Sequence, residues 1–266
     1  MNEAELLFTE VIHCSRQELY NRQYKALDKR QKEFITRALK RRLSGEPIQY
    51  ILGKADFMGL VFKVNPRVLI PRPETEILVE TTVKYARKAA PHKGKMNILD
   101  IGTGCGNIAI SLAKFLPEAL VIGLDISKSA LAVAKSNAAL NNVSNRIHFV
   151  CSDLFISTRA PAFLYDIIIS NPPYIPGAEM KNLQVEVRHE PGSALNGGED
   201  GLEFYRRIIS GSPDWLKENG ILALEMGFGQ CQSIKGIFAK SGKFDIIDIV
   251  KDYSGIERVL IAKKRA

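Results

Sequence analysis

Beyond residue 96, short apolar runs alternate along the chain with segments in which apolar residues recur at helical spacing. Residues 97–101, 119–124 and 147–151 are short runs rich in apolar residues, which is typical of buried strands. Residues 107–115 and 129–140, which lie between them, have the periodicity of helices. Because strands that alternate with helices pair into a mostly parallel sheet covered on both faces, this pattern predicts an α/β fold.

The alternation continues toward the C-terminus. We expect further strands at 165–170, 221–225, 244–250 and 258–262, and further helices at 201–216 and 230–241. Residues 176–200 are glycine-rich and lack periodicity, and a loop of this length is usually functional or mobile. In open sheets of this kind ligands bind at the carboxyl ends of the strands, so we expect the functional residues there.

The N-terminal part has a different organisation. Residues 1 to about 52 have helical periodicity, and Asp28 is placed to cap a helix that ends at Gly45. Residues 56–70 predict two short strands that turn at a glycine, and a helix is expected from Pro73 to about Ala90. The predicted domains are a helical domain at 1–55, a β-hairpin linker at 56–72 and an α/β domain at 73–266.

Composition limits the class of protein. The chain carries a net charge of +8, and residues 1–74 hold 14 Lys and Arg against 9 Asp and Glu, which is compatible with a nucleic-acid partner or with a merely basic protein. The four cysteines and four histidines lack the spacing of a zinc site or a disulfide framework, so we expect no metal. The N-terminus does not resemble a signal peptide, and no apolar run approaches the roughly 20 residues that span a bilayer. We expect a cytoplasmic protein.

A glycine-rich segment directly follows the first strand of the α/β part and precedes its first helix. It consists of Gly102, Thr103, Gly104, Cys105 and Gly106. Glycines let the backbone turn sharply and approach a ligand closely, and the helix N-terminus behind them offers free N–H groups. The spacing differs from that of pyrophosphate-binding loops, so this segment suits the amino-acid and ribose parts of a cofactor.

Two aspartates follow the next two strands. Asp125 lies 19 residues beyond Gly106, where a carboxylate can accept both hydroxyls of a ribose. Asp153 can accept a hydrogen bond from an adenine amino group, and either Leu154 or Phe155 could form the wall beside that ring. Each aspartate alone could instead be a turn or cap residue, but together they mark successive strand ends.

The strand at 165–170 ends in Asn171, Pro172, Pro173 and Tyr174. Proline lacks the N–H that a strand needs, so Asn171 is held at a strand tip on stiff backbone. Its carboxamide offers an acceptor oxygen and two N–H donors, and Tyr174 adds an aromatic face. The four residues can hold a planar amide or amine nitrogen, although on their own they fit a strand and a polyproline turn equally well.

Together these residues resemble a known family. The glycine loop and the two aspartates resemble the cofactor site of class I S-adenosylmethionine-dependent methyltransferases, and residues 171–174 are similar to the motif of those that modify amino groups. The whole chain resembles the peptide chain release factor glutamine N5-methyltransferases, the PrmC/HemK family. The motifs that carry this resemblance are 47–53, 69–76, 102–106, 171–174, 190–191, 194–195, 197–198, Asp252, Gly255 and Arg258.

The resemblance implies a Rossmann-like, seven-stranded methyltransferase sheet whose last strand is antiparallel, preceded by a helical substrate-recognition domain. It implies transfer of a methyl group from S-adenosylmethionine, which leaves S-adenosylhomocysteine, to the glutamine amide of the GGQ motif in class 1 release factors. That reaction modulates translation termination. The enzyme is expected to be a monomer with the release factor as its protein partner, and to need neither a membrane nor a stable nucleic-acid partner.

The resemblance also implies roles for single residues. Asn171 and the Pro172 carbonyl are expected to accept hydrogen bonds from the substrate amide, Tyr174 to stack on its plane, and Asn171 also to contact the cofactor. The other residues expected around the substrate are Pro173, Arg72, Pro73, Glu74 and Thr75. Some members of the family have an aromatic residue where this chain has Leu154, so the adenine wall is open between Leu154 and Phe155.

Two other functions stay open. A nucleic-acid methyltransferase that modifies adenine N6 or guanine N2 would use the same four-residue motif, but the sequence shows no inserted recognition domain and no aromatic–basic platform. A non-catalytic ribosome- or RNA-binding protein with this fold is disfavoured, because the glycine loop, Asp125 and Asn171 are all present.

Overall fold

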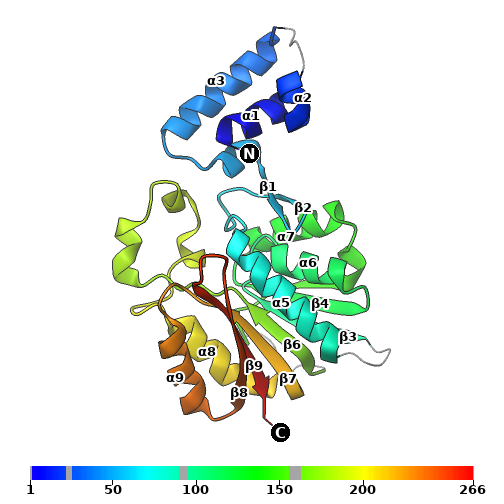
Figure 1. Cartoon of the computed structure of the whole chain (residues 1–266), viewed down its shortest axis with the longest axis vertical. Coiled ribbons are helices and arrows are strands. Elements are labelled where there is room, and N and C mark those ends of the chain that lie inside the picture. The colour runs from blue at the N-terminus through cyan, green and yellow to red at the C-terminus, as the bar shows by residue number, and fades with distance from the viewer. Residues whose placement is uncertain (1, 22–25, 90–94, 156–162, 266) are drawn as a thin grey trace.

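The computed structural model describes residues 2–21, 26–89, 95–155 and 163–265. The N-terminal helices lie together at one end of the molecule and the α/β part forms the other end (Figure 1). The N-terminal helices are α1 (Glu3–Ile12), α2 (Arg16–Asn21), α3 (Lys29–Leu43) and α4 (Ile48–Leu52). They enclose a small apolar core of Leu7, Val11, Ala38, Ile48 and Ile51. The predicted cap of α3 is confirmed, since the Asp28 carboxylate accepts from the backbone N–H of Gln31 at 2.8 Å.

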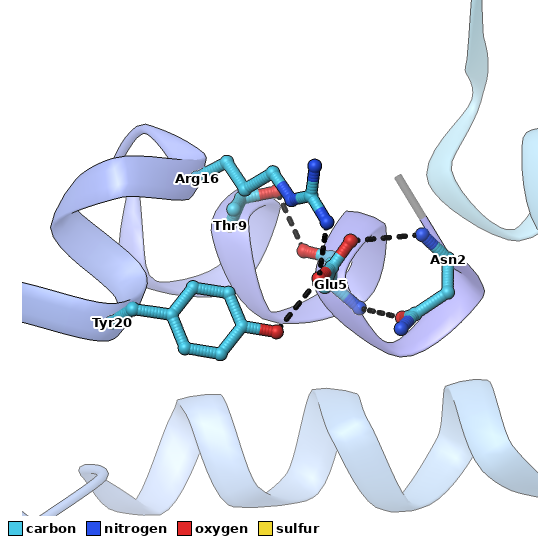
Figure 2. Close-up of polar contacts among 5 residues, drawn as sticks. All are labelled: Asn2, Glu5, Thr9, Arg16 and Tyr20. Atoms are coloured by element: carbon cyan, nitrogen blue, oxygen red, sulfur yellow. Dashed lines mark hydrogen bonds and ion pairs between the residues drawn. The ribbon is translucent and has the colours of Figure 1, made fainter.

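Glu5 lies at the centre of the polar contacts that join α1 to α2 (Figure 2). The Tyr20 hydroxyl and the Arg16 guanidinium donate to its Oε1 at 2.7 and 3.1 Å, and the backbone N–H of Asn2 donates to its Oε2 at 2.9 Å. Mainly because of the hydrogen bond from Tyr20, the pKa of Glu5 falls to about 2. These contacts therefore favour the ionised carboxylate.

A β-hairpin follows α4 and is fixed to the α/β part. Its strands are β1 (Lys54–Phe57) and β2 (Leu60–Lys63), which pair antiparallel. The backbone N–H of Met58 in the turn donates to the Glu76 carboxylate at 2.6 Å, and that of Lys63 donates to the Asn137 side chain at 2.7 Å. These two bonds attach the hairpin to two different helices of the α/β part.

Seven strands of the described residues form one sheet in the order β5-β4-β3-β6-β7-β9-β8. They are β3 (Met96–Ile101), β4 (Ala119–Asp125), β5 (Ile147–Cys151), β6 (Tyr165–Ser170), β7 (Leu216–Glu225), β8 (Phe244–Lys251) and β9 (Glu257–Lys264). The strands from β5 to β7 are parallel, whereas β9 runs antiparallel to both of its neighbours. The predicted seven-stranded sheet with an antiparallel last strand is confirmed.

Helices cover both faces of this sheet (Figure 1). They are α5 (Pro73–Ala89), α6 (Asn107–Phe115), α7 (Lys128–Leu140), α8 (Glu203–Gly211) and α9 (Cys231–Ser241). Successive residues of β6 serve opposite faces: Ile167 packs in the apolar cluster that includes α5 and α6, and Ile168 in the cluster that includes α8 and α9. Burial on both faces explains why the strands read as continuous apolar runs. The predicted end of α5 at Ala90 lies outside the described residues.

The predicted helix at 201–216 is wrong at its C-terminal end. Helix α8 stops at Gly211, and β7 already begins at Leu216, which pairs with Tyr165. Pro213 explains the stop, because proline has no N–H with which to continue the hydrogen bonds of the α-helix. The segment between them is a short 3-10 turn, Ser212–Asp214.

The long loop, residues 176–200, leaves the end of β6 and reaches the N-terminal helices (Figure 1, yellow-green). It contains three short 3-10 turns, Gly177–Asn182, Val187–His189 and Gly192–Ala194. The Arg42 guanidinium of α3 donates to Glu186 of the long loop at 2.9 Å and to Glu3 of α1 at 2.8 Å. Gly45 follows α3 and lies so close to Val185 that a Cβ atom there would overlap that side chain.

Candidate active site

The glycine loop after β3 is built from backbone that favours glycine. Gly102, Gly104 and Gly106 have φ angles of 73°, 55° and 85°. The backbone N–H groups of Gly102 and Thr103 donate to the carbonyl of Leu124 at 2.9 and 2.8 Å, which ties the loop to the end of β4. These backbone hydrogen bonds hold the loop in a sharp turn. Gly102 and Gly104 lie on the wall of a cavity.

Two of the predicted cofactor residues in this loop turn their side chains away from that cavity. The Thr103 hydroxyl donates to the Asp100 carboxyl at 2.6 Å, and Cys105 is buried in an apolar cluster. Asp100 is fully buried, and burial raises its pKa to about 7. Its second oxygen has no hydrogen-bond partner among the described residues. Sequence reasoning missed Asp100, although an acid within the apolar strand that enters a glycine loop is a visible signal.

Asp125 stands beside the loop at the end of β4. One of its oxygens accepts from the backbone N–H of Gly104 and the other from that of Ser127, both at 2.8 Å. Burial raises the pKa of Asp125. A carboxylate has about four acceptor positions, so two backbone bonds leave capacity for further hydroxyl donors.

Of the residues after β5, some line the cavity and others pack in the apolar core. Leu154 lines the cavity, whereas Phe155 does not: its ring packs against Trp215 with centroids 5.2 Å apart. Asp153 also lines the cavity and accepts from Arg207 of α8 at 2.7 Å. Phe204 supplies an aromatic wall residue that the sequence interpretation missed.

These residues enclose the first cavity, whose volume is about 400 Å³. It extends from the glycine loop past the ends of β4 and β5 to the end of β6. Its lining includes Gly102, Gly104, Asp125, Ser127, Asp153, Leu154, Asn171, Pro172, Pro173, Phe204 and Arg207. Cavities of this size accommodate small-molecule ligands, and this one combines apolar walls with a few acidic acceptors.

A second cavity of about 490 Å³ is also lined by Asn171 and Pro172. Its charged and aromatic lining consists of Arg72, Glu74, Tyr174, Glu225 and Arg258, and the long loop contributes Asn182, Leu183, Gln184, Val187, Ala194 and Leu195. Four residues line both cavities: Leu69, Asn171, Pro172 and Ala194. Asn171 and Pro172 therefore form part of a common wall.

Asn171 is oriented by a residue far away in the sequence. Its Nδ2 donates to the hydroxyl of Thr75 at 3.0 Å. No hydrogen bond among the described residues occupies its Oδ1, which leaves an acceptor at the common wall. Tyr174 lines the second cavity, and burial raises its pKa to about 12, so the phenol is neutral at ordinary pH.

The residues predicted around the substrate occupy different places. Arg72 and Glu74 line the second cavity, and Arg72 pairs with the buried Glu190 of the long loop. Thr75 is buried, with 2% of its surface exposed, behind Asn171. Pro73 lines neither cavity and lies at an outer depression with Asp252 and Tyr253.

Among the described residues, no helix is long and apolar enough to cross a membrane. The same residues contain no group of three or more His, Cys, Asp and Glu side chains that could hold a metal ion.

Three features together define a class I methyltransferase: the order of the strands in the sheet, the glycine loop after β3, and Asn171 at the end of β6. Residues 75–199 match the model of the methyltransferase small domain, and residues 1–53 match that of the PrmC N-terminal domain. A methyltransferase of known structure from Pyrococcus furiosus has the same fold, with a TM-score of 0.58 and 20% identity over 90% of this chain and 100% of that chain.

Two relatives carry the assignment further. The release factor glutamine methyltransferase of Thermodesulfovibrio yellowstonii is 40% identical over 99% of this chain and 92% of its own length. That of Geobacter sulfurreducens is 41% identical over 97% of this chain and 87% of its own length. The chain belongs to the release factor glutamine methyltransferase family.

Proposed function

We propose that this chain transfers a methyl group from S-adenosylmethionine to the side-chain amide nitrogen of a release factor glutamine, in the GGQ motif. The observation that carries the proposal is the wall shared by the two cavities. Asn171 and Pro172 are accessible from both, so a group bound on each side would meet there. Group transfer between two bound molecules needs such a meeting point.

The residues of the first cavity fit the cofactor. Asp125 offers acceptor positions for ribose hydroxyls beside the glycine loop, which suits the amino-acid part. Asp153 can accept from the adenine amino group, and Leu154 and Phe204 provide apolar walls for the ring. When bound, S-adenosylmethionine supplies an electrophilic methyl group on a sulfonium centre.

The protein's part of the reaction is to orient a poor nucleophile. The lone pair of a carboxamide nitrogen is delocalised into its carbonyl, so the nitrogen must be held at a suitable distance and angle. Asn171 Oδ1 and the Pro172 carbonyl would accept its two N–H groups from the common wall. Positioning of this kind can lower a barrier by about 7–11 kcal/mol at most.

Tyr174 and the long loop would hold the rest of the glutamine side chain. The Tyr174 ring offers an apolar face for the amide plane, and the long loop adds the apolar residues Leu183, Val187 and Leu195 to the lining. Pro172 and Pro173 keep this part of the backbone stiff, which reduces the conformational freedom lost on binding.

We further propose that the enzyme is a cytoplasmic monomer whose partner is the release factor, without a stable nucleic-acid partner. The N-terminal helices would contact the release factor, because they adjoin the long loop that lines the second cavity.

The decisive experiment incubates the full chain with radiolabelled S-adenosylmethionine and, separately, a purified release factor, RNA or DNA. We expect label on the release factor, at the GGQ glutamine by mass spectrometry, and none on a release factor in which that glutamine is replaced. Label on RNA or DNA alone would establish the nucleic-acid alternative. Binding of cofactor without transfer to any of the three would support a non-catalytic role.

A further inference from the structure

Glu225, at the end of β7, is a buried acid that none of the roles above uses. Its neighbour Leu224 pairs with Ser170, the last residue of the parallel strand β6. Glu225 therefore lies beside Asn171, which directly follows β6. Glu225 is 2% exposed and still lines the second cavity. One of its carboxyl oxygens has no hydrogen-bond partner among the described residues. A buried acid with an unpaired oxygen reduces stability, which is more usual for a functional group than for a structural one.

Thr75 connects this acid to Asn171. The Thr75 hydroxyl accepts from Asn171 Nδ2 at 3.0 Å. The side chains of Thr75 and Asn171 also lie close enough to the Glu225 carboxyl for their hydrogen bonding to lower its pKa, against the larger effect of burial. A hydroxyl has one proton to donate, so when Thr75 donates to Glu225 it can only accept from Asn171.

We infer that Glu225 is a positioning residue of the proposed methyl-transfer reaction, and that it acts through Thr75 to keep Asn171 Oδ1 directed toward the substrate amide. The inference rests on the proposed function. An ionised carboxylate can only accept, so it fixes the Thr75 hydroxyl as a donor and the Asn171 amide with Nδ2 toward Thr75. A protonated Glu225 could donate to Thr75, whose hydroxyl could then donate to a flipped Asn171 and occupy the oxygen that the substrate needs.

The groups around Glu225 determine the pH at which its carboxylate becomes protonated. Burial is the main effect on Glu225 and raises its pKa to about 7, and the charge of Glu74 in α5 acts in the same direction. Arg258 of β9 lowers the pKa, and its charge is shared with Asp252 at 2.9 Å. The phenols of Tyr174 and Tyr205 also lie near Glu225, and burial raises the pKa of each. Asn171 should therefore lose its productive orientation as the pH falls below about 7.

Matched substitutions at Thr75 test the geometry. Thr75→Val keeps the shape but removes the hydroxyl, and we expect kcat to fall about tenfold while KM for the release factor and the dissociation constant of the cofactor change little. Thr75→Ser restores the hydroxyl and should restore kcat. Thr82→Val is the control, because Thr82 is also a buried threonine of α5, and its hydroxyl bonds, among the described residues, only to the Leu78 carbonyl of its own helix.

Glu225→Gln tests the dependence on protonation. Glutamine retains an acceptor for Thr75 but does not titrate near neutral pH. We expect the kcat of the wild type to fall below about pH 7 and that of Glu225→Gln to remain level, with a melting temperature no lower than that of the wild type. Equal kcat for Thr75→Val and Thr75→Ser, or the same pH profile for wild type and Glu225→Gln, would overturn the inference. A wild-type enzyme that methylates no release factor at any pH would instead refute the proposed function.

Discussion

The side-chain amide of Asn171 donates a hydrogen bond of 3.0 Å to the hydroxyl of Thr75, which lies 96 residues earlier in the chain. Thr75 belongs to the first turn of α5, and Asn171 follows the last residue of β6. The bond therefore fixes the side chain at the common wall relative to a helix on one face of the sheet. Local sequence around Asn171 gives the stiff backbone, but its side-chain orientation depends on this distant contact.

Asn171→Ala should abolish methyl transfer and leave cofactor binding nearly intact. The substitution removes an oriented acceptor from the common wall, and losses of about 100- to 1,000-fold in kcat are typical for such groups. Mass spectrometry of the release factor measures the transfer, and calorimetry with S-adenosylmethionine provides the control. Undiminished methylation by the variant would show that Asn171 does not orient the substrate.

Leu154→Ala should weaken cofactor binding, whereas Phe155→Ala should lower the stability of the fold. Leu154 lines the first cavity, so its truncation should weaken cofactor affinity by about tenfold, the effect of about 1.4 kcal/mol of lost contact. Phe155 packs against Trp215, so its truncation should lower the free energy of unfolding by about 3 kcal/mol. Calorimetry and urea denaturation on both variants give the comparison. The opposite pattern would assign the adenine wall to Phe155.

Gly45→Ala should impair the contact between the N-terminal helices and the long loop. Gly45 has a φ of 89°, and an added Cβ would overlap the Val185 side chain. We expect a rise in KM for the release factor with an unchanged cofactor dissociation constant. Val185→Ala in the same chain should restore part of the loss, since it removes the overlap but not the backbone strain. No recovery in the double variant would mean that backbone strain alone accounts for the defect.

Glu5→Gln should destabilise the protein in a pH-dependent way. The hydrogen bonds from Tyr20, Asn2 and Arg16 lower the pKa of Glu5 from 4.5 to about 2, so its contribution is complete above the ordinary pKa and is lost as the pH falls toward 2. The difference in melting temperature between wild type and Glu5→Gln should therefore be largest at neutral pH and shrink in acid. Glu33→Gln, an exposed substitution on α3, is the control. A difference that stays constant with pH would contradict this role.

The sequence was sufficient for the parts of the fold that depend on local pattern. The alternation beyond residue 96 predicted the strands and helices of the sheet, because burial on both faces produces continuous apolar runs. It was insufficient at the end of α8, where the helix was expected to reach Leu216 although Gly211, Pro213 and Asp214 interrupt the apolar residues before Trp215 and β7. Glycine and proline are recognisable helix-stop signals, so this boundary is one that the local sequence does contain.

Some residues of the candidate site could likewise be predicted from the sequence, whereas others could not. Gly102, Asp125 and Asn171 lie at the carboxyl ends of strands, so their convergence could be expected from the parallel order of the sheet. Glu225 also lies at the end of a strand, but its position beside Asn171 depends on β6 and β7 being neighbours, which the order of the strands along the chain does not reveal. The choice between Leu154 and Phe155 depends on the backbone, because Leu154 has a φ of 49° that changes the direction of the chain there.

The common wall has a consequence for the order of events during turnover. The two cavities share Leu69, Asn171, Pro172 and Ala194 but are otherwise lined by different residues, so under the proposed function each ligand would occupy a cavity of its own. Spent cofactor could then be exchanged while the protein substrate stays bound, and methylated protein could leave while the cofactor side remains occupied. Under the proposed function we therefore expect a steady-state mechanism without a compulsory order of binding, in which cofactor and protein substrate bind independently.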